Sequence, residues 1–171
     1  VVAGAAAQTP DQAGPWIQAA AIGTIEDKGI KDANNMGAAM APAAYDTLSA
    51  FFRDTGYKPA DFDLILTGDL GELGHAIVRD FFHRDGVELD QRYQDCGMLL
   101  YDRQQQDMHA GASGCGCSAS VLTGYLLNGM REDRWKNILF CPAGALHSPT
   151  SAFQGESVPG ICHAIAISAV K

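Results

Sequence analysis

The sequence has few basic residues, and they form no run. Lysine and arginine number 12 against 20 aspartates and glutamates, which gives a formal net charge of −8. Nucleic-acid-binding proteins need clustered positive charge, so this composition argues against a nucleic-acid partner. The sequence also has no uninterrupted apolar run of about 18 residues, the least that a bilayer-spanning helix needs. We therefore expect no membrane-spanning helix.

Two common site signatures are missing as well. No G-x-G-x-x-G motif follows a predicted strand with an acidic residue at the required distance, so no dinucleotide site is predicted. The five cysteines are an odd number, and they lack the C-x-x-C spacing of structural zinc sites. Most have apolar, glycine or alanine neighbours, which indicates reduced thiols in a cytosolic compartment.

What is present is a globular composition, with 47% hydrophobic and 19% charged residues among 171. A chain of this length forms about one domain with a sizeable core. It opens at Val1 directly in an apolar stretch. We therefore expect a fragment of a longer chain.

Short apolar runs alternate with helical patterns, which predicts an α/β layered fold with a largely parallel sheet. The polar loop 8–15 would let the first two predicted strands pair as a hairpin. The last two strands are joined only by a loop at 143–160, so they should pair antiparallel. Strands are predicted at 1–7, 16–25, 62–67, 96–101, 137–141 and 161–170, and helices at 36–52, with Pro42 inside, at 71–84 and from the Gly-rich segment to residue 130.

Three glycine-rich loops follow predicted parallel strands, at 68–74, 102–116 and 143–160. The carboxyl ends of parallel strands meet at one edge of a sheet, where ligands bind. We therefore predict that the three loops converge on one pocket. In the last loop Ser148, Thr150, Ser151 and Glu156 either contact a carboxylate ligand or form turns.

The segment 109–130 combines glycines, two cysteines and an apolar helix. Unpaired N–H groups and the helix dipole at such a helix start favour negative charge. The same dipole would lower the pKa of Cys115 or Cys117, with His109 as a base. The segment therefore predicts an anion pocket or a thiol catalyst, unless its small residues serve only close packing. A zinc site from these three residues would lack a fourth ligand.

Other candidate residues have structural alternatives. Asp69 follows a strand end, where it could contact a ligand or serve as a helix N-cap. His75, His83 and His163 lie on predicted helices and a strand, and we expect structural roles for them.

Several long strings resemble the stage V sporulation protein AD family of spore-forming Firmicutes over almost the whole chain. They are NNMGAAMAPAA, LTGDLG, DCG, DMHAGASGCGCSA and SPTS..QGESVPGI.HA. That family is similar to thiolases and β-ketoacyl carrier-protein synthases, which have two pseudo-symmetric α/β halves. The resemblance implies that residues 1–30 form the closing hairpin of an N-terminal half. Residues 31–171 would form the C-terminal thiolase-like half, with a mixed, mostly parallel sheet and helices on both faces.

The resemblance also bears on catalysis. The second half of the synthases supplies a histidine and an asparagine. Here Thr67 opens the histidine loop without a histidine, Cys115 stands at the asparagine position, and Gly144 lies in the loop near the oxyanion site. Claisen chemistry needs paired polar groups for the developing oxyanion. The resemblance therefore implies a retained fold with lost catalysis; the alternative is an acyltransferase that uses a Cys–His pair.

What the resemblance implies instead is binding of dipicolinic acid, free or as its calcium chelate, with no cofactor and no resident metal. The protein would belong to a complex that moves dipicolinate into the forespore and out at germination. It would contact other proteins of that complex, form a homodimer, and lie peripherally on the cytoplasmic face of the spore inner membrane. The expected ligand-binding residues are Thr67, Asp69, His109, Cys115, Gly116, Cys117 and Gly144.

Overall fold

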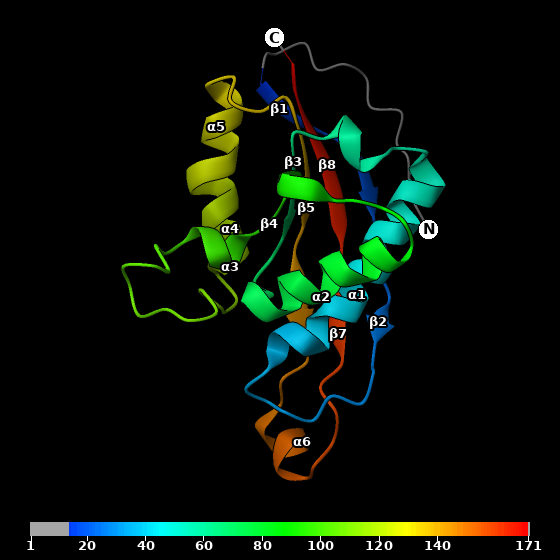
Figure 1. The fold of residues 1–171 in the computed structure, drawn as a ribbon, viewed down its shortest axis with the longest axis vertical. Helices are drawn as coiled ribbons and strands as arrows, with labels where there is room; N and C mark the ends of the chain where they lie inside the picture. The colour runs from blue at the N-terminus through cyan, green and yellow to red at the C-terminus, as the bar shows by residue number, and fades with distance from the viewer. Residues whose placement is uncertain (1–13, 171) are drawn as a thin grey trace.

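A five-stranded mixed sheet organises residues 14–170, which are the residues that the computed structural model describes (Figure 1). The three strands β3, β4 and β5 are parallel, and β8 runs antiparallel to both of its neighbours, β5 and β1. All strands but β8 therefore point the same way, which confirms the mixed, mostly parallel sheet and the antiparallel pairing of the last strand. The order across the sheet is β1 (Gly14–Ala21), β8 (Ala164–Val170), β5 (Asn137–Cys141), β3 (Leu64–Thr67) and β4 (Tyr93–Asp95).

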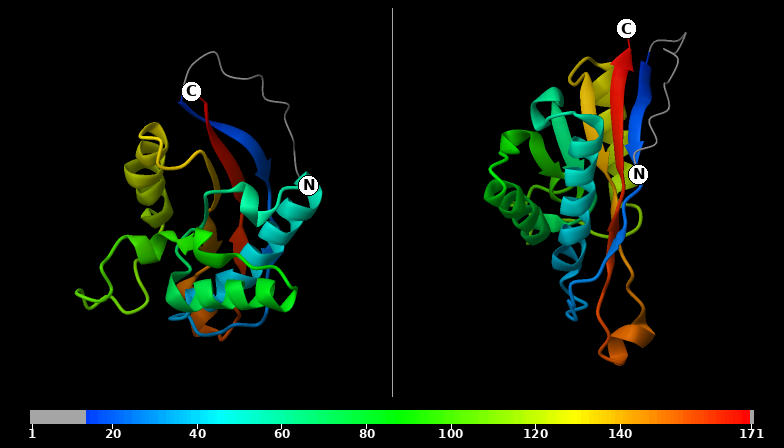
Figure 2. Two further views of the ribbon diagram at one scale, coloured as in Figure 1. Left: turned by 45° about the horizontal axis from the view of Figure 1, so that its top comes forward. Right: turned by 90° about the vertical axis from the view of Figure 1, so that its right-hand side faces the viewer.

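Helices cover both faces of this sheet, as predicted (Figure 2). On one face α1 (Met36–Thr55) and α2 (Gly71–Arg84) enclose a core that includes Met40, Phe51, Ile65, Val78, Tyr93 and Leu139. On the other face one helix runs through α4 (Cys117–Val121), the π-helical turn η3 (Leu122–Leu126) and α5 (Leu127–Arg131). Its core includes Leu66, Val121, Leu126, Met130, Ile138 and Phe140.

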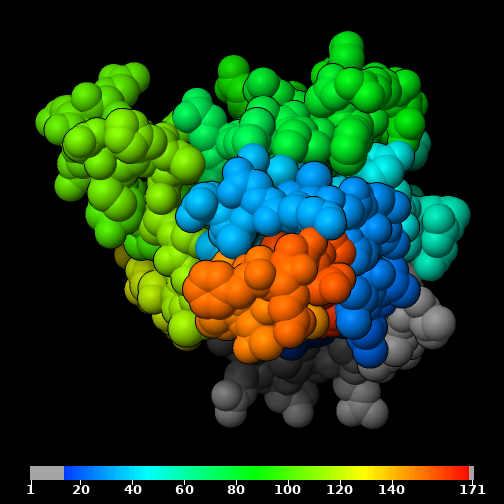
Figure 3. All heavy atoms as spheres, turned by 90° about the horizontal axis from the view of Figure 1, so that it is seen from below, coloured from blue at the N-terminus to red at the C-terminus, as the bar shows by residue number. Residues whose placement is uncertain are grey.

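A second, three-stranded sheet lies beyond the end of β5. It consists of β2 (Ile25–Glu26), β7 (Gly160–Cys162) and β6 (Ala143–Ala145), and α6 (Pro149–Phe153) forms its tip. Figure 3 shows the tip beside the stretch 22–35, and the Val158 N–H donates to the Ile30 carbonyl at 2.7 Å. The prediction of one unstructured loop at 143–160 is therefore wrong.

The start of α1 follows the predicted signal. Asn35 is the N-cap, and its side chain accepts the Ala38 N–H at 3.2 Å. The helix continues through Pro42 and ends at Gly56, whose φ of 75° is left-handed. The predicted helix is confirmed, and Pro42 does not divide it.

Two glycines let α1 and α2 approach closely. A Cβ on Gly37 would lie 2.1 Å from the Leu70 carbonyl oxygen, and one on Gly74 would lie 2.7 Å from the Gly37 carbonyl oxygen. Only glycine fits at such distances. The contact brings the beginnings of the two helices together.

Two predicted strands are placed differently. The strand at 96–101 is wrong, because β4 ends at Asp95 and the short helix α3 (Cys96–Leu99) follows at once. The strand at 16–25 ends at Ala21, and Pro15, expected in a loop, lies within β1. The short helices η1 (Pro59–Asp61) and η2 (Asp90–Arg92) precede β3 and β4.

The predicted strand 1–7 lies outside the described residues. Its proposed partner β1 pairs with β8 at the edge of the main sheet. The division of the chain into residues 1–30 and 31–171 stays a prediction about a longer protein.

Candidate functional site

The centre of the candidate site is the buried carboxylate of Asp95, at the end of β4. Its Oδ2 accepts the Thr67 hydroxyl at 2.7 Å and the Leu70 N–H at 3.0 Å. Its Oδ1 accepts the N–H groups of Gly71 at 3.1 Å and Gly97 at 3.0 Å. One side chain therefore holds together the end of β3, the start of α2 and the start of α3.

Opposing effects act on this carboxylate. Burial raises the pKa of Asp95 to about 6, while the hydrogen bonds from Thr67 and from backbone N–H groups act to lower it. A charged, buried acceptor with four donors has little freedom to move. Asp95 therefore fixes the geometry of the loops around it.

The N–H groups at the start of α2 are already used. Those of Leu70 and Gly71 donate to Asp95, and that of Glu72 donates to the Ala110 carbonyl at 3.0 Å. Thr67, a predicted ligand contact, is fully buried and serves the same carboxylate. These three N–H groups are therefore not available to an anion.

The Asp69 side chain forms two hydrogen bonds with the loop that follows β4. Its Oδ2 accepts the Gly114 N–H at 2.9 Å and the Ser113 hydroxyl at 3.3 Å. The N-cap position of α2 belongs to Leu70, so the interpretation of Asp69 as the cap is wrong. The loops after β3 and β4 meet here, as the strand pattern predicts.

A cavity of about 140 Å³ opens where these loops meet the start of α1. Among residues 14–170, no lysine, arginine or histidine lines it. Because its walls carry the NNMG, TGDLG and AGAS stretches, the strings that share the family resemblance come together in space. The lining residues are Asn34, Asn35, Met36, Gly37, Asp69, Leu70, Gly71, Leu73, Ala110, Gly111, Ala112 and Ser113.

The third predicted loop only borders this region. A Cβ on Gly68 would lie 2.8 Å from the Ala143 nitrogen, so the start of β6 abuts the loop after β3. Gly144 itself pairs with Ile161 in the three-stranded sheet and does not line the cavity. The prediction that all three loops converge is therefore wrong for the greater part of 143–160.

The surroundings of the two cysteines near the start of the helix that begins at Cys117 differ from the prediction. Gly116 is its N-cap, and a Cβ there would meet no atom within 4 Å. Burial, with smaller contributions from Asp69 and Asp95, raises the pKa of the Cys117 thiol to about 11. The predicted lowering is therefore wrong for Cys117, because burial outweighs the helix dipole. Cys115 is exposed.

His109 is not brought to either thiol. Its side chain is 90% exposed, and its Nε2 lies 3.1 Å from Asp107 Oδ1. Within the described residues, neither Cys115 nor Cys117 forms a hydrogen bond with this imidazole. The same part of the chain holds no group of three His, Cys, Asp or Glu side chains that could bind a metal ion.

The other histidines make structural contacts, as expected. His75 stacks on Tyr93 at 4.3 Å between ring centroids, and burial lowers its pKa. His163 Nδ1 accepts the Gly23 N–H at 3.2 Å. In the tip, the Ser148 side chain caps α6.

Comparison with known protein families shows which family this chain belongs to. The family model described as stage V sporulation protein AD (SpoVAD) matches residues 1–168. The chain belongs to the stage V sporulation protein AD family. It is 42% identical over 149 residues to Stage V sporulation protein AD of Bacillus subtilis (strain 168), which covers 87% of this chain and 44% of that protein. The chain thus spans less than half the length of that curated relative.

Solved structures of other proteins are similar in fold to this chain. MvaS in complex with 3-hydroxy-3-methylglutaryl coenzyme A matches with a TM-score of 0.55 and 12% identity, over 92% of this chain and 40% of MvaS. The 3-oxoacyl-(acyl carrier protein) synthase III FabH from Pseudomonas aeruginosa PAO1 matches with a TM-score of 0.49 and 10% identity, over 91% of this chain and 46% of FabH. The match to MvaS confirms the thiolase-like α/β fold. None of the helices in residues 14–170 is both long and apolar enough to cross a membrane.

Proposed function

We propose that this chain is part of a non-catalytic binding protein whose ligand is dipicolinate, taken up during sporulation and released at germination. The family membership supports the sporulation role, and the strings that resemble SpoVAD support the ligand. The observation that carries the proposal is the Asp95 cluster, which rigidly joins two glycine-rich loops beside the start of a long helix.

The arrangement of thiols and imidazole supports binding over catalysis. A thiol nucleophile needs an adjacent base or a lowered pKa. The pKa of Cys117 is raised by burial, and His109 points to Asp107 instead of a cysteine. Thr67, at the position of the synthase histidine, is buried and bonded to Asp95.

A rigid dianion suits the open surface at Gly116. The helix that starts at Cys117 continues to Arg131, so its dipole favours negative charge at its beginning. The nearby cavity has no cationic side chain, so neutralisation falls to calcium bound with the ligand or to residues outside this chain. We propose the backbone of Gly116 as the contact on this chain, because the Gly114 N–H and the Ser113 hydroxyl already donate to Asp69.

The remaining proposals concern the whole protein. We propose that it works with other proteins of a dipicolinate transport complex, as a homodimer, peripherally at the cytoplasmic face of the spore inner membrane.

Calorimetric titration of the full-length protein with dipicolinate, with and without calcium, tests the binding role. A phenylalanine at Gly116 meets open space, so the variant should fold while the ligand is blocked. We expect Gly116→Phe to weaken dipicolinate binding by about tenfold or more, because the side chain would occupy the space of the ligand and remove its contacts at the helix start. The matched control is Ala60→Phe, at an exposed position remote in sequence. Equal affinity in both variants would remove the helix start from the proposal.

The exposure of Cys115 favours a second candidate, an acyltransferase with a Cys–His pair. Alkylation by iodoacetamide across a range of pH separates the two. A thiol whose pKa, obtained from the pH dependence of alkylation, is well below that of free cysteine supports the acyltransferase, provided that its alkylation slows in His109→Ala. Thiols unaffected by His109→Ala support the binding protein.

A further inference from the structure

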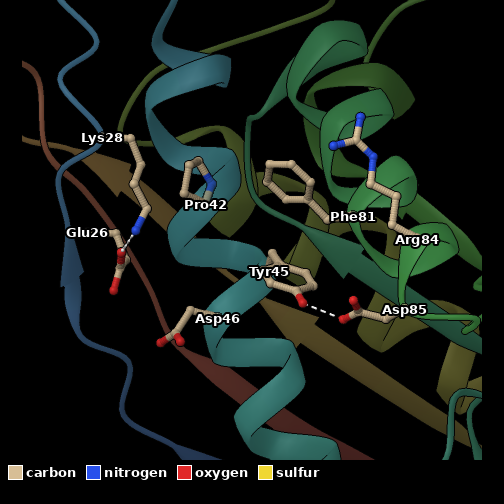
Figure 4. A pocket seen from close by; sticks show the side chains of 8 residues that line it. All are labelled: Glu26, Lys28, Pro42, Tyr45, Asp46, Phe81, Arg84 and Asp85. Carbon is tan, nitrogen blue, oxygen red and sulfur yellow. Dashed lines mark hydrogen bonds and ion pairs between the residues drawn. The ribbon is translucent and has the colours of Figure 1, made fainter.

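A larger cavity lies between β2, α1 and the end of α2 (Figure 4). Its volume is about 420 Å³, within the range of small-ligand pockets. It shares no residue with the cavity beside Asp69. Its lining residues are Glu26, Lys28, Pro42, Tyr45, Asp46, Phe81, Arg84 and Asp85.

One part of the wall is apolar and aromatic. The rings of Tyr45 and Phe81 meet edge to face with centroids 5.2 Å apart, and Pro42 lies beside them in Figure 4. The apolar part of a ligand can pack against such a surface, and the faces of the aromatic rings attract a positive charge.

Some charged side chains around this surface form ion pairs, and others do not. The Lys28 ammonium pairs with Glu26 at 2.7 Å, and Arg84 pairs with Asp80 at 2.7 Å. Asp85 accepts the Tyr45 hydroxyl. In the part of the chain that the structure describes, Asp85 has no lysine, arginine or histidine nitrogen within ion-pair distance. The cavity therefore offers a fixed, unneutralised carboxylate at the edge of an aromatic surface.

Asp46 adds to this charge from α1. Its Oδ2 accepts the Thr24 hydroxyl at 3.2 Å, and it too forms no ion pair within the described residues. A dicarboxylate would be repelled by these two groups, so the site differs in chemistry from the one proposed for dipicolinate.

We propose that this cavity binds an organic ammonium group on an apolar stem, with the stem against Pro42 and Phe81 and the ammonium at Asp85. The chemistry is shared by a free alkylamine and by a lysine side chain of a partner protein. The proposal does not depend on the dipicolinate site.

The test is calorimetry of the full-length protein with two probes, n-pentylammonium chloride and Nα-acetyl-lysine amide. Asp85→Asn keeps an acceptor for Tyr45 and removes the charge; we expect it to weaken binding about tenfold or more. Glu88→Gln removes an exposed carboxylate that follows α2 and does not line the cavity, and it should leave affinity unchanged. Phe81→Leu, which keeps bulk but removes the ring, should weaken binding by a smaller factor.

Binding of n-pentylammonium alone would identify a free amine as the source, and binding of the lysine derivative a protein side chain. No binding of either probe, or an equal effect of Asp85→Asn and Glu88→Gln, would overturn the proposal.

Discussion

The Thr67 hydroxyl donates a hydrogen bond of 2.7 Å to Asp95, and the two residues are direct partners at the ends of the parallel strands β3 and β4. Three backbone N–H groups from the following turns point at the same carboxylate. The two loops of the candidate site thus share one acceptor, so their stability depends on it.

Removal of that acceptor should destabilise the fold. In Asp95→Ala three buried N–H groups and the Thr67 hydroxyl lose their partner, which we expect to cost about 2 to 4 kcal/mol of unfolding free energy. Asp95→Asn keeps one acceptor oxygen and should cost less. Urea unfolding measures both, with the exposed Asp107→Asn as control. Equal stability of Asp95→Ala and the control would contradict the role of this cluster.

The same carboxylate should make stability depend on pH. The pKa of Asp95 in the folded protein, about 6, is above the usual value of 3.8. The folded state therefore holds more protons between these values, so the stabilisation that comes from protonation of Asp95 is complete below about pH 4 and is lost as pH rises through about 6. We expect the unfolding free energy of the wild type, relative to Asp95→Asn, to fall by roughly 3 kcal/mol at most over this range. A difference that is constant between pH 4 and 7 would refute this assignment.

The contact of α1 with α2 gives a prediction about packing. Gly37→Ala places a methyl group against the Leu70 carbonyl and should cost about 1 to 3 kcal/mol, because neither backbone can retreat without disturbing its helix. Gly124→Ala is the matched change, since a Cβ there meets open space. It should be neutral or stabilise by up to about 1 kcal/mol. Thermal unfolding of the two variants checks the contrast, and similar shifts would argue against close helix contact at Gly37.

The cysteines should react with iodoacetamide in a defined order. Cys115 is exposed and should be modified first, whereas burial raises the pKa of Cys117 to about 11 and slows it. The remaining three are buried and should react only on unfolding. Mass spectrometry of peptides over time gives the order; faster modification of Cys117 than of Cys115 at neutral pH would show that its environment is not as described.

Much of the fold follows from local sequence. The helix α2 has the predicted limits, 71–84, and α1 begins as predicted because Asn35 caps it. The apolar run 96–101 misleads, since its first residues are turned into a helix by the side chain of Asp95. That N-cap bond spans only two residues and is a local helix-start signal, which the apolar run obscures.

The candidate site is harder to predict, because its contacts join residues that are far apart in the sequence. Asp95 was visible only within the DCG string, and its burial depends on β3 and on the start of α2. Asp69 and the loop before Gly116 were correctly associated. The expected residues His109 and Gly144 lie apart from the cavity lining, because one sits in an exposed turn and the other in a second sheet.

A crystal structure of the full-length protein grown with dipicolinate tests the central claim most directly. We predict dipicolinate bound against the Gly116 backbone at the start of the helix, with Asp95 still holding both loops and the thiols unmodified. Dipicolinate bound elsewhere, or an acyl group attached to Cys115 with His109 beside it, would contradict the account.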